Sequence, residues 1–115
     1  MTLGEPRDCG DCGAKPGELH RPGCDVERCA ACGDQRLFDD CGTRTKKRLP
    51  WTGHWPGYAE CIEFGWACRR NPRGPGYIEC SPDHPEARPD LNRLAIEGVW
   101  DRKAGRFRKP TVAAR

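Results

Sequence analysis

The stretch "HRPGCDVERCAACG", residues 20–33, places one histidine and three cysteines within fourteen residues, together with a proline and two glycines. Histidine nitrogen and cysteine thiolate are the ligands that zinc takes in closed, tetrahedral protein sites. A Cys-x2-Cys pair on a tight turn can occupy two corners of such a tetrahedron, while N–H groups of the turn point at the sulfur atoms. We therefore predict that zinc organises this part of the chain.

Six of the nine cysteines fall within residues 1–41, and their spacing is repetitive. Two Cys-x2-Cys pairs are each followed directly by a glycine, which lets the chain turn sharply without a Cβ clash. A His-x3-Cys pair lies between them. Two Cys-x2-Cys pairs with a His-x3-Cys pair between them are typical of zinc sites. The predicted metal ligands are Cys9, Cys12, His20, Cys24, Cys29, Cys32, Cys41 and, as an eighth, Cys61.

Two ways of sharing these ligands between two zinc ions stay open. Sequential wiring places the first four in one site and Cys29, Cys32 and Cys41 in a second, and it is favoured because short loops close at lower entropic cost. Interleaved wiring joins the two Cys-x2-Cys pairs, whose 16-residue gap also fits a four-cysteine zinc site. Cys61, on a predicted helix, is the preferred eighth ligand; the alternatives are His54, Cys68 and Cys80. Cys68 and Cys80 otherwise suit small buried positions in a hairpin.

The composition explains why a metal would be needed. Leu, Ile, Val and Phe make up 15 of 115 residues, which is below the roughly 20% at which a chain is suspected of lacking a core. The net charge is only +3, so the composition is not typical of a disordered chain. We therefore expect disulfides or a bound metal to stabilise the fold. No secretory signal opens the chain, and no apolar stretch approaches the ~20 residues of a membrane helix. We therefore expect a cytoplasmic protein, in which reduced thiols bind metal.

Charge divides the chain into two parts. Residues 1–41 carry a formal charge of −4, and residues 42–115 carry +7. We predict a zinc-binding lobe over 1–41, a basic, tryptophan-rich part over 42–110 packed on it as one compact unit, and a frayed tail over 111–115. The expected fold class is a small, metal-stapled α+β protein with a zinc-knuckle-like or zinc-ribbon-like lobe, two β-hairpins and one or two short helices.

Turn and cap residues predict the elements of the second part. Proline at a first helical position and glycine at the end predict helices over "PGYAECIEFG" and "PDLNRLAIEG". Strand-like runs "GWACRR" and "GYIEC" around "NPRGPG" predict one hairpin, and "SPDHPEARP" is expected to be loop. The run "GVWDRKAGRFRKP" predicts a second hairpin, in which Asp101 opens the turn and Gly105 closes it in the left-handed conformation.

The basic run "RTKKR" lies beside aromatic residues, which suits phosphate pairing and base stacking. The predicted partner-binding residues are Arg44, Lys46, Lys47, Arg48, Trp51 and Trp55. Alternatively, the charges solvate loops and the tryptophans form the core; the mild pI of 8.4 makes a protein partner at least as fitting. We predict a non-catalytic, zinc-stabilised binding module that acts on a protein complex or nucleic acid, with no membrane and no small-molecule substrate.

A second hypothesis is a metal-dependent nuclease. The run "YIECSPDHPEARPDLNRL" places His84 after a predicted strand and Asn92 at a predicted helix, as in HNH-type nucleases, where a histidine activates water and an asparagine positions it. The gap between the two residues is very short, and no further histidine follows on the helix. The alternative is that His84 lies in an exposed loop and that Asp90 and Asn92 cap the helix.

Taken together, "HRPGCDVERCAACGDQ", "PWTGHWPGYAECIEFGW" and "PDLNRL" resemble a family of small cysteine-rich proteins of actinobacteria and their phages, from Cys9 to about Trp100. The resemblance implies a zinc-ribbon-like or zinc-knuckle-like protein, and it implies no particular activity. The family pattern has a further cysteine shortly after the position of Cys41, where this chain reads "CGTRT". This difference leaves the fourth ligand of a second site open.

Overall fold

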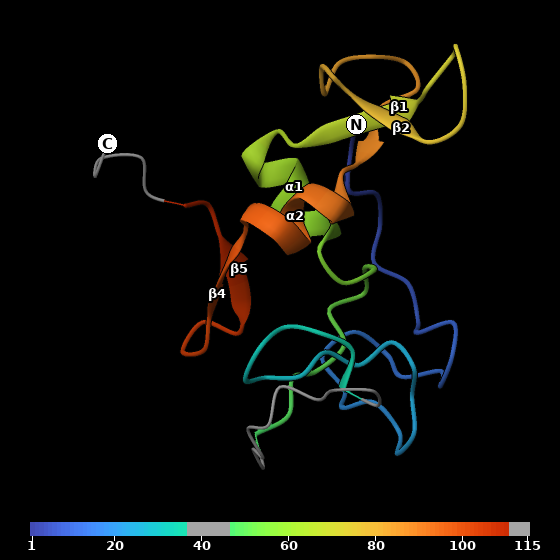
Figure 1. The fold of residues 1–115 in the computed structure, drawn as a ribbon. Helices are drawn as coiled ribbons and strands as arrows, with labels where there is room; N and C mark the ends of the chain where they lie inside the picture. The colour runs from blue at the N-terminus through green and yellow to red at the C-terminus, as the bar shows by residue number, and fades with distance from the viewer. Residues whose placement is uncertain (37–46, 111–115) are drawn as a thin grey trace. The chain divides into compact units, whose positions relative to one another are not determined.

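The computed structural model describes residues 1–36 and 47–110 (Figure 1). In order, these contain α1 (Tyr58–Phe64), β1 (Ala67–Arg70), β2 (Tyr77–Cys80), β3 (Arg88–Pro89), α2 (Leu91–Glu97), β4 (Val99–Asp101) and β5 (Arg106–Arg108). None of these helices has the length and apolar character that a membrane crossing requires. The described residues therefore form a small α+β protein, as the sequence predicts.

The chain divides into two compact units. The cysteine unit comprises Gly4–Pro56 and Trp100–Arg106, and the sheet unit comprises Met1–Leu3, Gly57–Val99 and Phe107–Arg115. The predicted boundary between residues 41 and 42 lies outside the described residues, as does the predicted tail over 111–115. Residues 47–56, predicted to belong to the basic part, cluster with the cysteines.

The sheet unit contains a three-stranded antiparallel sheet in the order β2-β1-β3. Ala67 pairs with Cys80 on one side and with Pro89 on the other, so the first predicted hairpin is confirmed. The expectation that residues 81–89 are entirely loop is wrong at its end, because Arg88–Pro89 forms the edge strand β3. Proline lacks a backbone N–H, so it is tolerated at a sheet edge, and sequence patterns alone do not distinguish this case from a loop.

Both predicted helices are present and are followed by the expected glycines, but α1 begins at Tyr58 and not at the predicted Pro56, because Gly57 precedes it in the left-handed conformation. Gly65 ends α1 in the left-handed conformation, and its N–H donates to carbonyls of the last turn. The Asp90 side chain caps α2 by accepting from the backbone N–H of Arg93. The two helices pack against each other (Figure 1). The core beside them consists of Cys61, Trp66 and Leu94, with Phe64, Leu91 and Phe107 at its margin.

The second predicted hairpin, β4–β5, is also confirmed. Asp101 Oδ1 accepts from the backbone N–H groups of Lys103 and Ala104, each at 3.0 Å. Gly105 has a φ of 66° and donates its N–H to the Asp101 carbonyl at 2.8 Å. A side chain at this φ would be strained, so glycine closes the turn.

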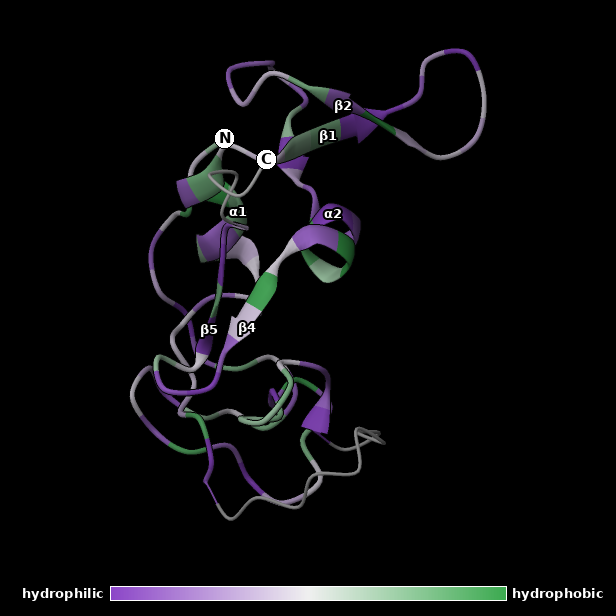
Figure 2. Cartoon of the chain, turned by 60° about the vertical axis from the view of Figure 1, so that its left-hand side comes forward, coloured by the Kyte–Doolittle hydropathy of each residue, from purple (hydrophilic) through white to green (hydrophobic). Residues whose placement is uncertain are grey.

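The described part of the cysteine unit is mostly irregular, with two isolated bridges, Arg28 to Gln35 and Cys29 to Arg48. Strongly hydrophobic stretches are short and scattered (Figure 2). The buried cluster of this unit consists of Cys9, Ala14, Cys24 and Trp51. Such a core offers little aliphatic area, so the cysteines themselves supply much of what is buried.

Candidate metal centre

The first Cys-x2-Cys pair lies on a tight turn closed at both ends by backbone hydrogen bonds. The N–H of Gly13 donates to the Cys9 carbonyl at 2.9 Å, and the N–H of Cys9 donates to the Ala14 carbonyl at 2.8 Å. Gly13 has a φ of 78°, which explains why glycine follows the pair. The turn directs Cys9 and Cys12 toward one point, which is what a bidentate metal half-site requires.

The second Cys-x2-Cys pair repeats this turn. The N–H of Gly33 donates to the Cys29 carbonyl at 2.8 Å, the N–H of Cys29 donates to the Asp34 carbonyl at 2.6 Å, and Gly33 has a φ of 83°. The N–H of Ala31 also points at Cys29 Sγ, at 3.4 Å, as expected of a turn that stabilises a thiolate. A Cβ on Gly33 would overlap the ring of Trp100, so the turn also packs closely on β4.

Four ligand atoms converge in the cysteine unit. The thiols of Cys9, Cys12 and Cys24 and the imidazole of His20 offer atoms that all lie within 4.8 Å of one another. Cys9 Sγ lies 3.7 Å from Cys24 Sγ, and His20 Nδ1 lies 3.4 Å and 3.3 Å from the Sγ atoms of Cys12 and Cys24. A zinc tetrahedron with Zn–S of about 2.3 Å and Zn–N of about 2.0 Å has edges of about 3.8 Å and about 3.5 Å. The measured separations match those edges, with Nδ1 as the histidine ligand.

The thiols of the cluster are electrostatically unequal. Desolvation raises the pKa of Cys24, an effect only partly offset by the Val26 N–H that points at its Sγ at 3.4 Å. At Cys12 desolvation also acts upward, but hydrogen bonds from the backbone and from His20 and Cys24 outweigh it and lower the pKa. One thiolate therefore forms readily, and a divalent cation would favour ionisation of the remaining thiols.

Trp51 forms one wall of the cluster. Its ring is 6% exposed and meets the His20 ring edge-on, with the centroids 5.5 Å apart. Its Nε1–H donates to the Arg7 carbonyl at 2.6 Å, and its backbone bonds to Gly17 and Glu18. Trp51 is thus part of the core, which is the alternative role that the sequence allowed, and it presents no open ring face for stacking.

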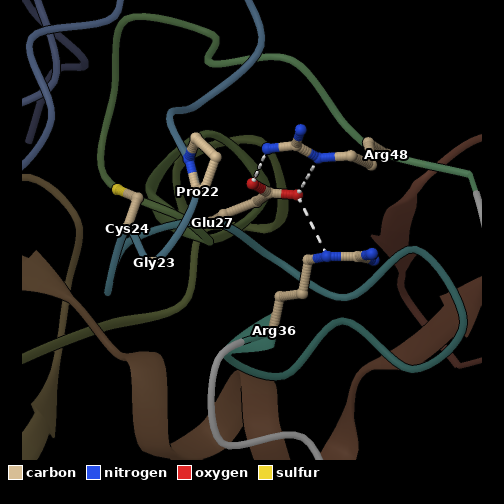
Figure 3. Close-up of a pocket in the computed structure, with 6 residues that line it drawn as sticks. All are labelled: Pro22, Gly23, Cys24, Glu27, Arg36 and Arg48. Carbon is tan, nitrogen blue, oxygen red and sulfur yellow. Dashed lines mark hydrogen bonds and ion pairs between the residues drawn. The ribbon is translucent and has the colours of Figure 1, made fainter.

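A buried carboxylate, Glu27, lines the same pocket as the candidate ligand Cys24 and is bound by two arginines (Figure 3). Glu27, 3% exposed, accepts two hydrogen bonds from Arg48, from Nε at 3.0 Å and from Nη2 at 2.5 Å. Arg36 Nε lies 3.5 Å from the same carboxylate. Arg48 Nη2 also donates to the His20 carbonyl at 2.6 Å, so the guanidinium joins Glu27 to the backbone of a candidate ligand. The hydrogen bond with Glu27 raises the pKa of Arg48.

Sequence reasoning did not identify Glu27 as a site residue. An acidic residue between two ligand pairs carries no distinctive pattern, and its arginine partner lies 21 positions along the chain. A pocket of about 340 Å³ adjoins this ion pair (Figure 3); its lining consists of Glu27, Arg36 and Arg48 together with Pro22, Gly23 and Cys24.

The other predicted ligands are placed differently. Cys29 is 1% exposed and Cys32 is partly buried, whereas Cys41 lies outside the described residues. Cys61 belongs to the sheet unit, where it is fully buried in α1 and its Sγ donates to the Asp90 carbonyl at 3.4 Å. Desolvation raises the pKa of Cys61 to about 12, as in a buried, neutral thiol. Within the described residues it joins no metal-binding group.

Within the described residues, the alternative eighth ligands do not belong to the Cys9 group either. Cys68 is buried in β1, and desolvation raises its pKa. Cys80 ends β2 and is partly buried. His54 is partly buried in the loop before α1, where its N–H lies 3.4 Å from Thr52 Oγ1.

The predicted partner-binding residues are not assembled into one surface by the described part of the chain. Arg44 and Lys46 lie outside the described residues. Lys47 Nζ donates to the Arg102 carbonyl at 3.1 Å, and Arg48 is engaged by Glu27. Trp55 is 53% exposed. The engaged cations and the buried Trp51 serve the internal structure of the cysteine unit.

The residues of the nuclease hypothesis occupy a turn and a helix start. His84 Nδ1 accepts from the backbone N–H of Glu86 at 3.0 Å, and the His84 backbone bonds to Ser81 and Ala87. Asn92 is exposed in the first turn of α2, which Asp90 caps. The only group suited to a metal ion among the described residues is the Cys9 cluster, so His84 has no metal partner there.

Comparison of the chain with protein-family models, with curated proteins and with solved structures finds no match in any of the three. The described residues define a cysteine-rich α+β protein with a Cys3His cluster suited to metal binding.

Proposed function

We propose that the chain is a non-catalytic binding module whose cysteine unit is held together by zinc. One observation carries the proposal: three sulfur atoms and one imidazole nitrogen lie within 4.8 Å of one another, and the Cys9–Cys24, Cys12–His20 and Cys24–His20 separations are close to the edges of a zinc tetrahedron. Four protein ligands close the coordination sphere, which is the arrangement of structural zinc sites; catalytic sites keep a position open for water.

The small core gives the metal a structural purpose. The buried cluster contains two of the candidate ligands, Cys9 and Cys24, and the tryptophan that packs on a third, His20. Without a cation, three thiols and an imidazole would face one another with little aliphatic packing around them. Binding energy at such a site contributes directly to folding, so chelation should unfold the unit.

We extend the proposal to two zinc ions. The Cys29–Cys32 turn has the same hydrogen bonds as the Cys9–Cys12 turn, which supports a second half-site of the same kind. Cys41 and one further ligand would complete it. The module would act in the cytoplasm on a protein complex or nucleic acid, with a regulatory role in a phage or its host as part of the proposal.

The proposal is tested by native mass spectrometry of the chain purified without added metal. We expect two bound zinc ions in the wild type, one fewer in Cys24→Ser, and two in the control Cys68→Ser, whose thiol lies in the sheet unit. Cobalt(II) added to the metal-free wild type should give the intense visible absorption of a tetrahedral thiolate site, and this band should weaken in Cys24→Ser. A metal-free wild type, or equal metal content in both variants, would contradict the proposal.

A further inference from the structure

One face of the three-stranded sheet carries a set of arginines around a tyrosine. The register pairs Arg70 with Tyr77, and it pairs Cys68 with both Glu79 and Arg88. Residues two apart on a strand, and residues directly opposite each other, share a face of the sheet. Arg70, Tyr77, Glu79 and Arg88 therefore lie on the same side; we call this side the Tyr77 face.

Tyr77 is the most exposed ring in the sheet unit. Its side chain is 50% exposed. The Arg88 guanidinium lies 5.3 Å from the ring centroid, and its Nη1 donates to the tyrosine hydroxyl at 3.1 Å. One cation thus fixes the ring in place while half of its surface stays open to solvent, which is the arrangement of a stacking platform.

Two pockets adjoin this ring. One, of about 210 Å³, is lined by Tyr77, Tyr58, Cys68, Arg88 and the residues from Pro89 to Asn92. The other, of about 270 Å³, is lined by Tyr77, Arg70 and residues 74–76. An aromatic ring between two hollows, each with an arginine at its wall, offers places for consecutive planar groups joined by anionic links.

The charges of this region are unbalanced in favour of an anion. The Tyr77 face carries Arg70 and Arg88 against one carboxylate, Glu79, and the hairpin loop at residues 71–76 adds Arg73 and no acidic residue. In the described part of the chain, Arg70, Arg73 and Arg88 form no ion pair with a carboxylate. The nearby carboxylates have partners of their own: Glu79 pairs with Arg93, and Asp90 caps α2.

We propose that the Tyr77 face binds single-stranded nucleic acid. A base stacks on the open side of the Tyr77 ring, and the adjoining phosphates pair with Arg70, Arg73 and Arg88. Asn92, exposed at the wall of the pocket of about 210 Å³ that Tyr58 also lines, supplies an amide for the edge of a neighbouring base. The inference rests on the proposed function, since it names the partner class of that binding module and moves the contact surface from residues 44–55 to the sheet unit.

The test is fluorescence anisotropy of labelled 12-nucleotide oligo(dT) and oligo(rU) with the zinc-loaded full chain. Stacking on one aromatic ring is worth ~1–3 kcal/mol per base, so Tyr77→Ala should weaken binding about tenfold. Tyr77→Phe keeps the ring and should bind as the wild type does. The two oligomers distinguish DNA from RNA, and a duplex of the same length should bind more weakly than either, because its bases are already stacked.

A charge-matched pair of variants separates the Tyr77 face from general electrostatics. Arg70→Ala and Arg102→Ala remove the same charge, but Arg102 lies in the β4–β5 turn of the cysteine unit, where its side chain is exposed. Loss of one phosphate contact lowers the slope of log K against log salt by about 0.7 for single strands. We expect that decrease for Arg70→Ala and an unchanged slope for Arg102→Ala.

Several results would overturn the inference: equal affinities of Tyr77→Ala and the wild type, equal salt slopes of the two arginine variants, or duplex binding as tight as single-strand binding. A chain that holds zinc but binds no oligomer at low salt would also overturn it, and would leave a protein partner for the module. Zinc content measured on the same samples keeps this failure distinct from failure of the metal proposal. Melting curves of each variant show that the fold is retained.

Discussion

Replacement of Glu27 by glutamine tests how strongly the buried ion pair supports the metal centre. The change keeps the size of the side chain but removes its charge. Glutamine has one carbonyl oxygen to accept from Arg48, and its amide NH2 faces the other guanidinium donor. One of the two charge-assisted hydrogen bonds from Arg48, the one from Nε at 3.0 Å or the one from Nη2 at 2.5 Å, is therefore lost, and that Arg48 N–H is left without an acceptor.

The magnitude follows from the burial of the two partners. The Glu27 side chain is 4% exposed and the Arg48 side chain 29% exposed, so the pair is screened on one side only. A hydrogen bond to a charged group contributes ~1.5–3 kcal/mol, and breaking a fully buried pair costs ~3–5 kcal/mol. We expect about 2 kcal/mol for this half-open pair, which lowers the melting temperature of a chain of this size by about 8 °C.

The same variant should bind metal more weakly, because Arg48 also bonds to the carbonyl of His20. Residues that orient metal ligands typically change affinity ~10–100-fold, and an indirect contact through the backbone should lie near tenfold. Zinc-loaded protein is melted by differential scanning fluorimetry, and zinc affinity is measured by competition with a chromophoric chelator. Glu5→Gln, an exposed position in the same unit, is the control. If Glu27→Gln melts and binds zinc as Glu5→Gln does, the ion pair does not support the site.

Three further predictions concern the turns and the core. Gly33→Ala should cost about 3 kcal/mol, from left-handed strain plus overlap with the Trp100 ring. Gly13→Ala, at the equivalent position of the first Cys-x2-Cys turn and without such an overlap, should cost about 1 kcal/mol, as urea midpoints will show. Leu94→Ala should cost about 3 kcal/mol, and the exposed Ile96→Ala less than about 0.5 kcal/mol, in the same assay. Cys61 should resist iodoacetamide at pH 9 until guanidinium unfolds the chain, and labelling of the folded chain would refute this. Because folding raises the pKa of Cys61 from 9.0 to about 12, the buried thiol contributes its full stabilisation below about pH 9, and this contribution is lost as the pH rises toward 12.

Local chemistry made the turns and helix ends predictable. Glycine after each Cys-x2-Cys pair, Gly105 in the second hairpin and Gly65 after α1 all have positive φ, a conformation that other residues rarely adopt. Asp101 and Asp90 accept the hydrogen bonds expected of a turn opener and a helix cap. These features depend on a few adjacent residues, so sequence spacing determines them almost completely.

Features set by distant contacts could not be predicted in the same way. β3 forms only because Arg88 and Pro89 lie beside β1, about twenty positions earlier in the chain. The role of Trp51 was open between core and partner surface, since both need an aromatic residue near basic ones. The edge-on contact between the Trp51 and His20 rings shows that Trp51 belongs to the core, and this contact joins residues 31 positions apart.

The four candidate ligands show where local pattern and distant contact meet. The short His20-x3-Cys24 segment itself brings His20 Nδ1 and Cys24 Sγ to 3.3 Å of each other, but only the tertiary fold brings both toward the Cys9–Cys12 turn, where Cys9 Sγ lies 3.7 Å from Cys24 Sγ. The segment that closes over them also carries Arg48, which links Glu27 to the carbonyl of His20. We therefore expect metal binding and the ordering of residues 47–51 to depend on each other. Removal of the cation should release Trp51 as well as the thiols, and quenching of tryptophan fluorescence by iodide should rise on chelation.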